Sequence, residues 1–288
     1  MNQADLRAHI EQKIRSARLE ILPFPHMIIN DFLPQEVYDK VLEFNLFTTN
    51  DGTPWNSGSG KTGTTSRALN ATPYQLRSQI NFHKRAPEFE ASPEVTEFWD
   101  MIQSTFLSDT WFPRTIFAKF PEYFYLRFGE NAERDDFWTI CRKALFVQRH
   151  KMGYDLGPHT DIPTRIFTCL FSFPETTGYE QYGTALLRHT TPYTISTGHR
   201  HHSFDGFETV KMNEYKPNNF MCFFKTVHAF HAVPPIKEEL PNQRYGMQFQ
   251  FHEPLKGLLQ ELGASIAPSA QEKIAAKRAE PESVTISP

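Results

Sequence analysis

The residues of this sequence with the clearest chemical potential are a histidine and an aspartate two positions apart, His159 and Asp161, in GYDLGPHTDIPTRIFTCLFSF. On an extended strand, residues i and i+2 point to the same side, so the imidazole and the carboxylate would converge on one point. A histidine from a distant strand would complete a triad that suits ferrous iron and leaves coordination positions open. Alone, H-x-D is a common pair, so its meaning depends on the rest of the chain.

Candidates for the third ligand and for a carboxylate-binding group lie further along, in NNFMCFFKTVHAFHAVPPIKEELPNQRYGMQFQF. Two histidines compete for the ligand position, His228 and His231. The run from Arg244 alternates polar with apolar residues, and a period of two puts the polar set on one face of a strand. A polar face on a core strand costs free energy unless it lines a site, so we expect Arg244 to face the triad. Its planar guanidinium matches a carboxylate, and the alternative is a surface salt bridge.

In their order, these parts resemble the iron- and 2-oxoglutarate-dependent dioxygenase superfamily, in its prolyl-hydroxylase-like branch. The resemblance covers roughly residues 144–252. Its parts are G-Y-x-L-x-P-H-T-D, a Gly183–Thr184 step, N-x-x-x-x-F from Asn219, H-A-V-P-P-I and Arg244. It implies a double-stranded β-helix (jelly roll) with iron near one mouth. It selects His231 as the distal ligand, because the family's ligand directly precedes a small residue and Val-Pro.

The resemblance also implies roles for further residues. Arg244 would bind the distal carboxylate of 2-oxoglutarate, and Ser172 and Thr168 are candidates for its second partner, since Gly246 stands where many relatives carry Ser. Gln148 would lie beside the co-substrate. Candidate substrate contacts are Arg165, His228, Trp55 and Arg67, the last two in a segment at 50–75 that is rich in Gly, Ser, Thr and Asn and is either disordered or a lid. The expected cofactors are Fe(II), 2-oxoglutarate and O2, with ascorbate as a further candidate.

The function that the resemblance implies is hydroxylation of an unactivated C–H bond. One compact domain without targeting or binding modules suits a small metabolite as substrate, such as an amino acid or a natural-product intermediate. A peptidyl side chain is an alternative substrate, and oxidative cyclisation or desaturation is an alternative outcome. Asp161 favours hydroxylation over halogenation, because related halogenases have Gly or Ala there. Rival readings are a cupin-like metal-binding protein without oxygenase activity and an inactive jelly-roll binding module. Only an oxygenase needs the carboxylate clamp that Arg244 would provide.

Composition narrows the class of protein. Of 288 residues, 39% are hydrophobic and 26 are Phe, so the core needs no disulfide or metal staple. The net charge of −3 indicates no nucleic-acid or membrane-surface partner. The three cysteines are far apart and are expected to be reduced and buried.

The sequence has neither a signal-peptide block nor a membrane-length apolar run, which predicts a cytoplasmic protein. We expect it to be monomeric or homodimeric and to act on a small molecule. His199, His201 and His202 share no face and are expected in a solvated loop at the pocket rim.

The elements that must position these residues can be predicted from periodicity. Helices are expected over residues 3–20, 34–44 and 94–120, the last with breaks near Ser108 and Pro113, and a strand in PFPHMIINDFL. From residue 144 onward, six short runs bounded by Gly, Pro and Asn predict strands: ALFVQRH, RIFTCLFSF, GTALLRH, FETVKM, NFMCFFKT and RYGMQFQFH. The prediction is an α+β fold that is mainly β, with helical support (1–143) for a jelly-roll core (144–255). We expect one domain over 1–263 and a flexible tail over 264–288.

Overall fold

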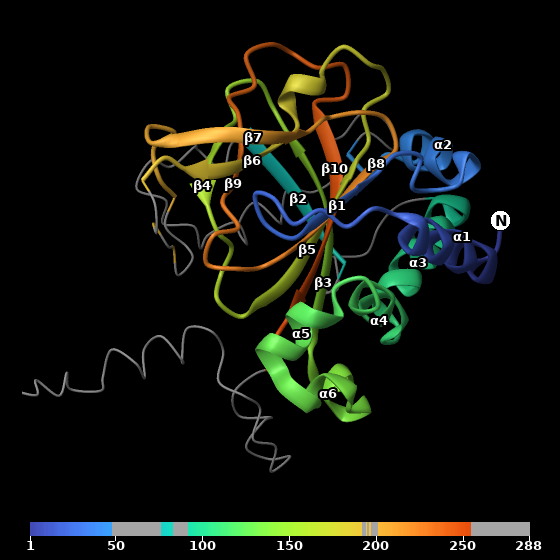
Figure 1. Cartoon of the computed structure of the whole chain (residues 1–288). Helices are drawn as coiled ribbons and strands as arrows, with labels where there is room; N and C mark the ends of the chain where they lie inside the picture. Colours follow the sequence, from blue (N-terminus) through green and yellow to red (C-terminus); the bar gives the residue numbers. More distant parts are fainter. Residues whose placement is uncertain (48–75, 83–91, 192–193, 195, 197–200, 255–288) are drawn as a thin grey trace, which may run out of the picture.

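The computed structural model describes residues 1–47, 76–82, 92–191, 194, 196 and 201–254. These residues form helices and two antiparallel sheets (Figure 1). The helices are α1 (Gln3–Ser16), α2 (Gln35–Glu43), α3 (Pro93–Leu107), α4 (Trp111–Phe117), α5 (Pro121–Phe128) and α6 (Asp135–Ile140), with the 3₁₀ turns η3 (Gly129–Glu133) and η4 (Glu180–Tyr182). The strands are β1 (His26–Ile29), β2 (Arg77–Asn81), β3 (Arg142–His150), β4 (Leu156–His159), β5 (Arg165–Ser172), β6 (Thr184–His189), β7 (Phe207–Asn213), β8 (Asn219–Phe224), β9 (His231–Val233) and β10 (Arg244–His252). The predicted tail at 264–288 lies outside the described residues.

The pairing of the strands is nested around the centre of the chain. β3 pairs with β10, β4 with β9, β5 with β8, and β6 with β7. One sheet has the order β1-β8-β5-β10-β3-β2, and the other has the order β4-β9-β6-β7. Nesting of this kind places strands that are far apart in the sequence side by side, which is how two ligand-bearing segments can meet.

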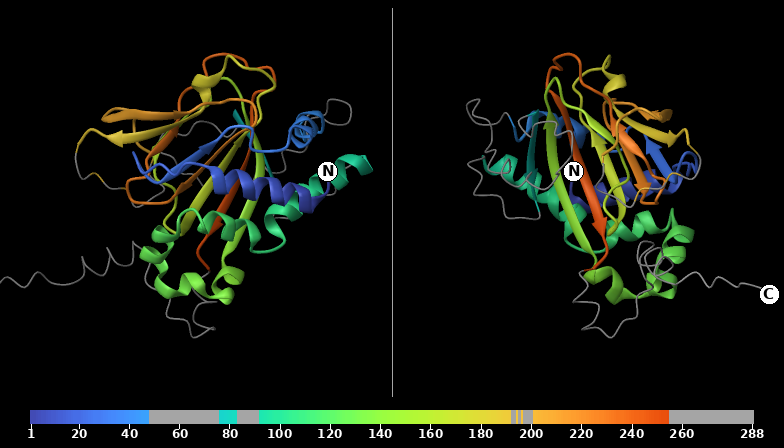
Figure 2. Two further views of the ribbon diagram at one scale, coloured as in Figure 1. Left: turned by 45° about the vertical axis from the view of Figure 1, so that its right-hand side comes forward. Right: turned by 90° about the vertical axis from the view of Figure 1, so that its left-hand side faces the viewer.

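The six-stranded sheet lies between the helices and the four-stranded sheet (Figures 1 and 2). The predicted period of two along β10 is confirmed, because Tyr245, Met247, Phe249 and Phe251 are buried while the alternate residues are partly exposed. The buried set joins the helices in one hydrophobic cluster. The polar set of β10 therefore lies on the opposite face, toward the four-stranded sheet.

Helices α1 to α4 follow the sequence pattern, whereas α5 and α6 lie outside the predicted helices. In α1, buried Leu6, Ile10 and Ile14 recur at helical spacing, and the Asn2 side chain accepts a hydrogen bond from the Asp5 backbone N–H at 2.9 Å. The break expected near Ser108 is confirmed between α3 and α4. The break expected at Pro113 is wrong, because Pro113 lies in the first turn of α4, where an N–H has no partner within the helix.

The region expected to be a helical support contributes two strands, of which one was predicted. β1 extends the six-stranded sheet beside β8, as the run PFPHMIINDFL predicts. β2 was not predicted and extends the other edge beside β3. The sequence RSQIN has neither an apolar run nor a clear alternation, so its strand conformation comes from pairing with β3 rather than from local preference.

A close contact between strands explains the glycine at position 246. A Cβ added to Gly246 would lie 2.5 Å from the backbone oxygen of Phe171, on the neighbouring strand β5. Any larger residue would therefore require β10 and β5 to separate. Glycine at position 246 is thus tied to the packing of these two strands.

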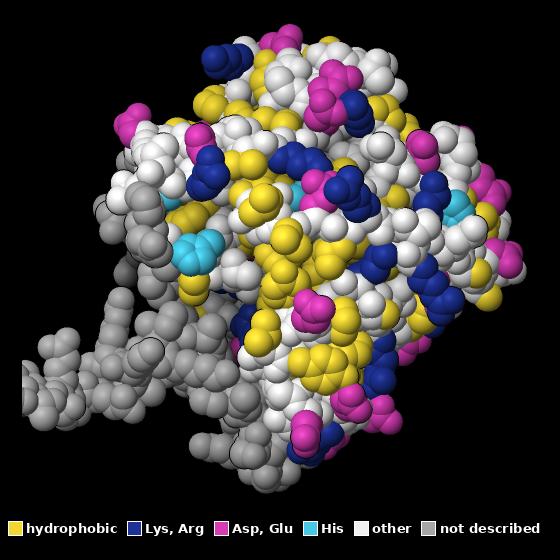
Figure 3. Space-filling model, viewed as in Figure 1, with side chains coloured by type: hydrophobic (Ala, Val, Ile, Leu, Met, Phe, Trp, Pro, Cys, Tyr) yellow, Lys and Arg dark blue, Asp and Glu magenta, His cyan; other side chains and the backbone are white. Residues whose placement is uncertain are grey.

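Three further expectations concern the cysteines, the membrane and the surface. Cys141, Cys169 and Cys222 are free and buried, as predicted. Within the described part of the chain, no helix has the length and hydrophobicity needed to cross a membrane. On the face shown in Figure 3, basic and acidic side chains are interspersed rather than gathered by sign.

Candidate metal centre

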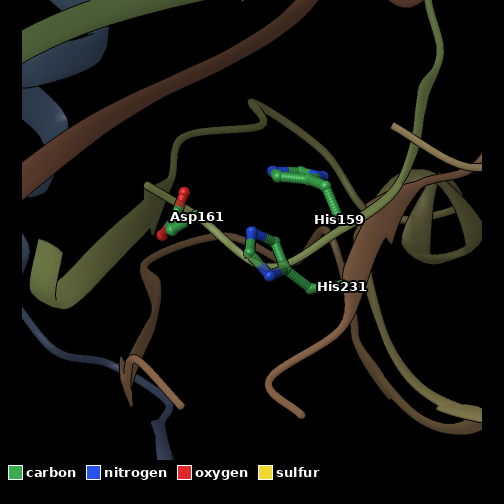
Figure 4. A group of neighbouring side chains, drawn as sticks. All are labelled: His159, Asp161 and His231. Atoms are coloured by element: carbon green, nitrogen blue, oxygen red, sulfur yellow. The ribbon is translucent and has the colours of Figure 1, made fainter. Parts of the chain in front are cut away.

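The structure brings His159, Asp161 and His231 together. One ligand atom from each lies within 4.8 Å of the others (Figure 4). His159 is the last residue of β4 and His231 is the first of β9, and the two are register partners. Asp161 lies just beyond the end of β4 rather than on the strand, yet its carboxylate turns toward both imidazoles. His228, the competing histidine, is exposed and not part of this group.

The backbone fixes which nitrogen each imidazole offers to a metal. His159 Nδ1 lies 2.9 Å from the carbonyl oxygen of Gly157, and His231 Nδ1 lies 3.0 Å from that of Ala229. A carbonyl can only accept, so both Nδ1 atoms carry the proton and both Nε2 atoms keep a lone pair. Burial lowers the pKa of both histidines, which keeps them neutral and ready to ligate.

The carboxylate of Asp161 is held by two neighbours on β5. The Thr168 hydroxyl donates to Asp161 Oδ2 at 2.7 Å, and Arg165 Nη1 lies 3.3 Å from the same oxygen. Arg165 also donates to Thr168 at 2.9 Å, which closes a triangle. Burial alone raises the pKa of Asp161, but the charge of Arg165 and the Thr168 hydrogen bond outweigh it, so the pKa is lowered. Asp161 is therefore an anion whose Oδ2 is engaged, which leaves Oδ1 for a metal.

These residues fit a metal ion with two nitrogen ligands and one oxygen ligand. Metal–ligand bonds of about 2.1 Å place two ligands of one ion at most about 4.2 Å apart, so small side-chain movements close the observed site. The donor set is the two-histidine, one-carboxylate triad typical of non-haem ferrous iron. The hydrogen bonds at Nδ1 and at Oδ2 are the outer contacts that orient such ligands.

The pocket that holds the triad also contains Arg244. Its Nε donates to the Tyr182 carbonyl at 2.6 Å and its Nη2 to the Thr184 hydroxyl at 3.3 Å. Its Nη1 lies 3.3 Å from His150 Nδ1, which must accept because a guanidinium only donates. Burial lowers the pKa of Arg244, although a guanidinium keeps its proton. No salt bridge among the described residues involves Arg244, so its charge is available to an anionic ligand.

Of the other predicted site residues, some line the pocket and others do not. Ser172, Thr168 and Gln148 line the same pocket as the triad. Arg165, proposed from sequence as a substrate contact, is buried and paired with Asp161. His228 is exposed, and its ring lies 3.1 Å from the carbonyl oxygen of Thr194. Trp55 and Arg67 lie outside the described residues.

The histidine-rich segment approaches the centre more closely than expected. We expected His201 in a solvated loop, but its ring stacks on that of His159, with centroids 4.5 Å apart. A Cβ added to Gly157 would lie 2.6 Å from the His202 carbonyl oxygen, so glycine at this position permits the approach. His199 lies outside the described residues.

Two pocket residues, Arg77 and His150, were missed from the sequence. The alternation of Gln148 and His150 along β3 was the available signal for His150. No comparable pattern marked Arg77, because its strand was not recognised.

The nested antiparallel sheets thus carry a buried two-histidine, one-carboxylate group that could hold a metal ion, with an arginine in the same pocket. No family model matches the chain, and no curated protein matches its sequence. The structural neighbours are 2-oxoglutarate and Fe(II) oxygenases, including prolyl hydroxylases.

A prolyl hydroxylase from Trichoplax adhaerens, in complex with a hypoxia inducible factor peptide, is 13% identical, with 91% of this chain and 94% of that chain covered and a TM-score of 0.42. A Phytophthora capsici prolyl 4-hydroxylase is 11% identical (88% and 65% covered, TM-score 0.42). A Burkholderia pseudomallei 2OG-Fe(II) oxygenase family protein is 11% identical (88% and 90% covered, TM-score 0.37). The chain thus spans about two thirds of the Phytophthora protein. Because these sequence identities and TM-scores are low, the argument for a function rests on the side chains of the site.

Proposed function

We propose that this protein is a non-haem Fe(II)- and 2-oxoglutarate-dependent dioxygenase that hydroxylates a C–H bond of a small molecule. The observation that carries the proposal is the buried triad in one pocket with Arg244, a cation without an acidic partner among the described residues. A protein that only binds a metal needs the triad but has no use for an unpaired guanidinium in the same pocket. The nested strand pairing supports a double-stranded β-helix.

Each group of the pocket has a role in this proposal. His159 and His231 hold the iron through Nε2, and Asp161 holds it through Oδ1 while Thr168 and Arg165 fix Oδ2. The guanidinium of Arg244 binds the carboxylate at the far end of 2-oxoglutarate. When bound, iron and 2-oxoglutarate supply the oxidising power for the C–H bond.

The walls of the pocket limit access of water to this chemistry. Among the residues that line it are the apolar Leu156, Leu170 and Val233. Exclusion of water strengthens electrostatic interactions within a site and protects reactive species from side reactions. The chain's contribution is therefore to orient the reactants and to keep the centre dry.

The proposal is tested by anaerobic addition of Fe(II) and then 2-oxoglutarate to the full-length protein. A chelate of the keto acid with iron gives a weak visible charge-transfer band, which we expect for the wild-type protein. His231→Ala should abolish the band, and His228→Ala, three residues earlier and exposed, is the matched control that should keep it.

The outcomes separate the rival readings. Iron binding without a band on addition of 2-oxoglutarate would favour the metal-binding protein over the oxygenase. A band that survives in His231→Ala would show that the distal ligand is assigned to the wrong residue. Succinate release in air then reports turnover.

A further inference from the structure

The edge strand β2 presents polar side chains on the face that carries the metal pocket. Arg77 pairs with His150 of β3, and His150 pairs with Arg244 of β10. Residues opposite each other in antiparallel strands share a face, so these three form one row across three strands. In the next row, Gln79 lies opposite Gln148. Arg77 and Gln148 both line the metal pocket.

Among the described residues, Arg77 has neutral partners only. Its Nη2 donates to the amide oxygen of Gln79, and Gln79 in turn donates to the Asn81 side chain at 2.7 Å. Its Nε is buried and unpaired among the described residues, and none of their salt bridges involves Arg77. A half-buried guanidinium that is bonded to an amide keeps its full charge for an anion.

The charge of the pocket favours a second anion beside the anionic co-substrate. The charged residues in its described lining are Arg77, Arg244 and Asp161, which leaves an excess of positive charge. Arg165, behind Asp161, adds to this excess. Iron brings two positive charges and 2-oxoglutarate two negative charges, so their binding leaves the excess unchanged. A further anion would balance it.

A buried acceptor lies one row from Arg77. The amide oxygen of Gln148 is buried and unpaired among the described residues. A buried acceptor costs free energy unless a donor reaches it. A ligand with a carboxylate for Arg77 and an N–H group for Gln148 would satisfy both.

We propose that the primary substrate is a small amino-group-bearing carboxylate, an α-amino acid or a close derivative, whose carboxylate is bound by Arg77 and whose N–H group faces Gln148. This inference rests on the proposed function. It assigns Arg77 to the substrate, whereas the two carboxylates of 2-oxoglutarate are accounted for by iron and Arg244. A guanidinium binds a carboxylate through two parallel hydrogen bonds, which a lysine cannot reproduce.

The experiment uses the full-length protein with Fe(II) and 2-oxoglutarate under anaerobic conditions. Free L-α-amino acids are titrated one at a time, each beside its primary carboxamide, and the shift of the charge-transfer band is followed. We expect at least one amino acid to shift the band and its carboxamide to bind about ten-fold more weakly or worse, through loss of a charge-assisted pair. Arg77→Gln should weaken binding of that amino acid by a similar factor.

Two variants make the result specific. Arg77→Lys keeps the charge without the planar fork and should bind the amino acid with intermediate affinity. Arg188→Gln removes an arginine of the far sheet, where it pairs with Glu208 and is 68% exposed, and should match the wild type. Thermal unfolding of each variant shows whether it is folded.

The remaining outcomes reject either the assignment of Arg77 or the proposed function. If the band forms but no amino acid shifts it, the proposed function stands and this inference fails. Equal binding of acid and carboxamide, or unchanged binding in Arg77→Gln, also rejects it. Weaker binding of 2-oxoglutarate itself in Arg77→Gln would place Arg77 in the co-substrate site. Absence of the band in the wild type would reject the proposed function.

Discussion

Replacement of Arg244 by glutamine tests the link between the guanidinium and the co-substrate. A guanidinium has five N–H groups. In Arg244, three of these N–H groups donate to Tyr182, His150 and Thr184. The two that remain match the two oxygens of a carboxylate. Charge-assisted hydrogen bonds contribute about 1.5 kcal/mol each, so their loss amounts to about 3 kcal/mol, or roughly a hundred-fold in affinity.

The measurement is anaerobic titration of 2-oxoglutarate into the Fe(II)-loaded protein. We expect Arg244→Gln to raise the Kd for 2-oxoglutarate by roughly a hundred-fold and Arg244→Lys to give a smaller loss, because lysine keeps the charge without the fork. The affinity for Fe(II) alone should stay close to that of the wild type, since Arg244 is not a ligand. A Kd for 2-oxoglutarate within about three-fold of the wild type, in a folded variant, would refute the reasoning.

Two further predictions concern the groups around the centre. Thr168→Val removes the hydrogen bond to Asp161 and should weaken metal binding by about ten- to a hundred-fold, measured by metal titration; an unchanged Kd would show that Arg165 alone orients the carboxylate. Burial lowers the pKa of His26 and His150 below the ordinary 6.5. As the pH falls through that value, both histidines take up protons in the unfolded chain but not in the folded chain, so the folded state loses stability. The melting temperature of the metal-free protein should therefore fall from about pH 7.5 to about pH 5.5, less steeply in His26→Gln, and a constant melting temperature would contradict this.

The parts of the site that could be predicted from sequence are those that local spacing encodes. H-T-D, H-A-V-P-P-I and the alternation after Arg244 each lie within one short run, so their residues could be found without knowing which strands are neighbours. Arg77 could not be found in this way. Its position beside His150 and two strands from Arg244 follows from the pairing of β2 with β3, which the sequence RSQIN does not encode locally.

The roles of Thr168 and Arg165 show the same limit. Both lie on the strand after Asp161. From the sequence, Thr168 is a candidate contact to the 2-oxoglutarate carboxylate and Arg165 is a candidate contact to the substrate. The short turn between β4 and β5 folds them back onto Asp161 itself. That turn geometry depends on where each strand ends, and strand ends are the least predictable feature of a sequence.

The nested strand order ties metal affinity to the completion of folding. His159 and His231 become neighbours only when β9 docks against β4, and that contact closes one of the widest loops in the β core. An ion that binds only the assembled site adds its binding free energy to the closure of the four-stranded sheet. We therefore expect removal of iron to destabilise the four-stranded sheet before the six-stranded sheet, which packs against the helices.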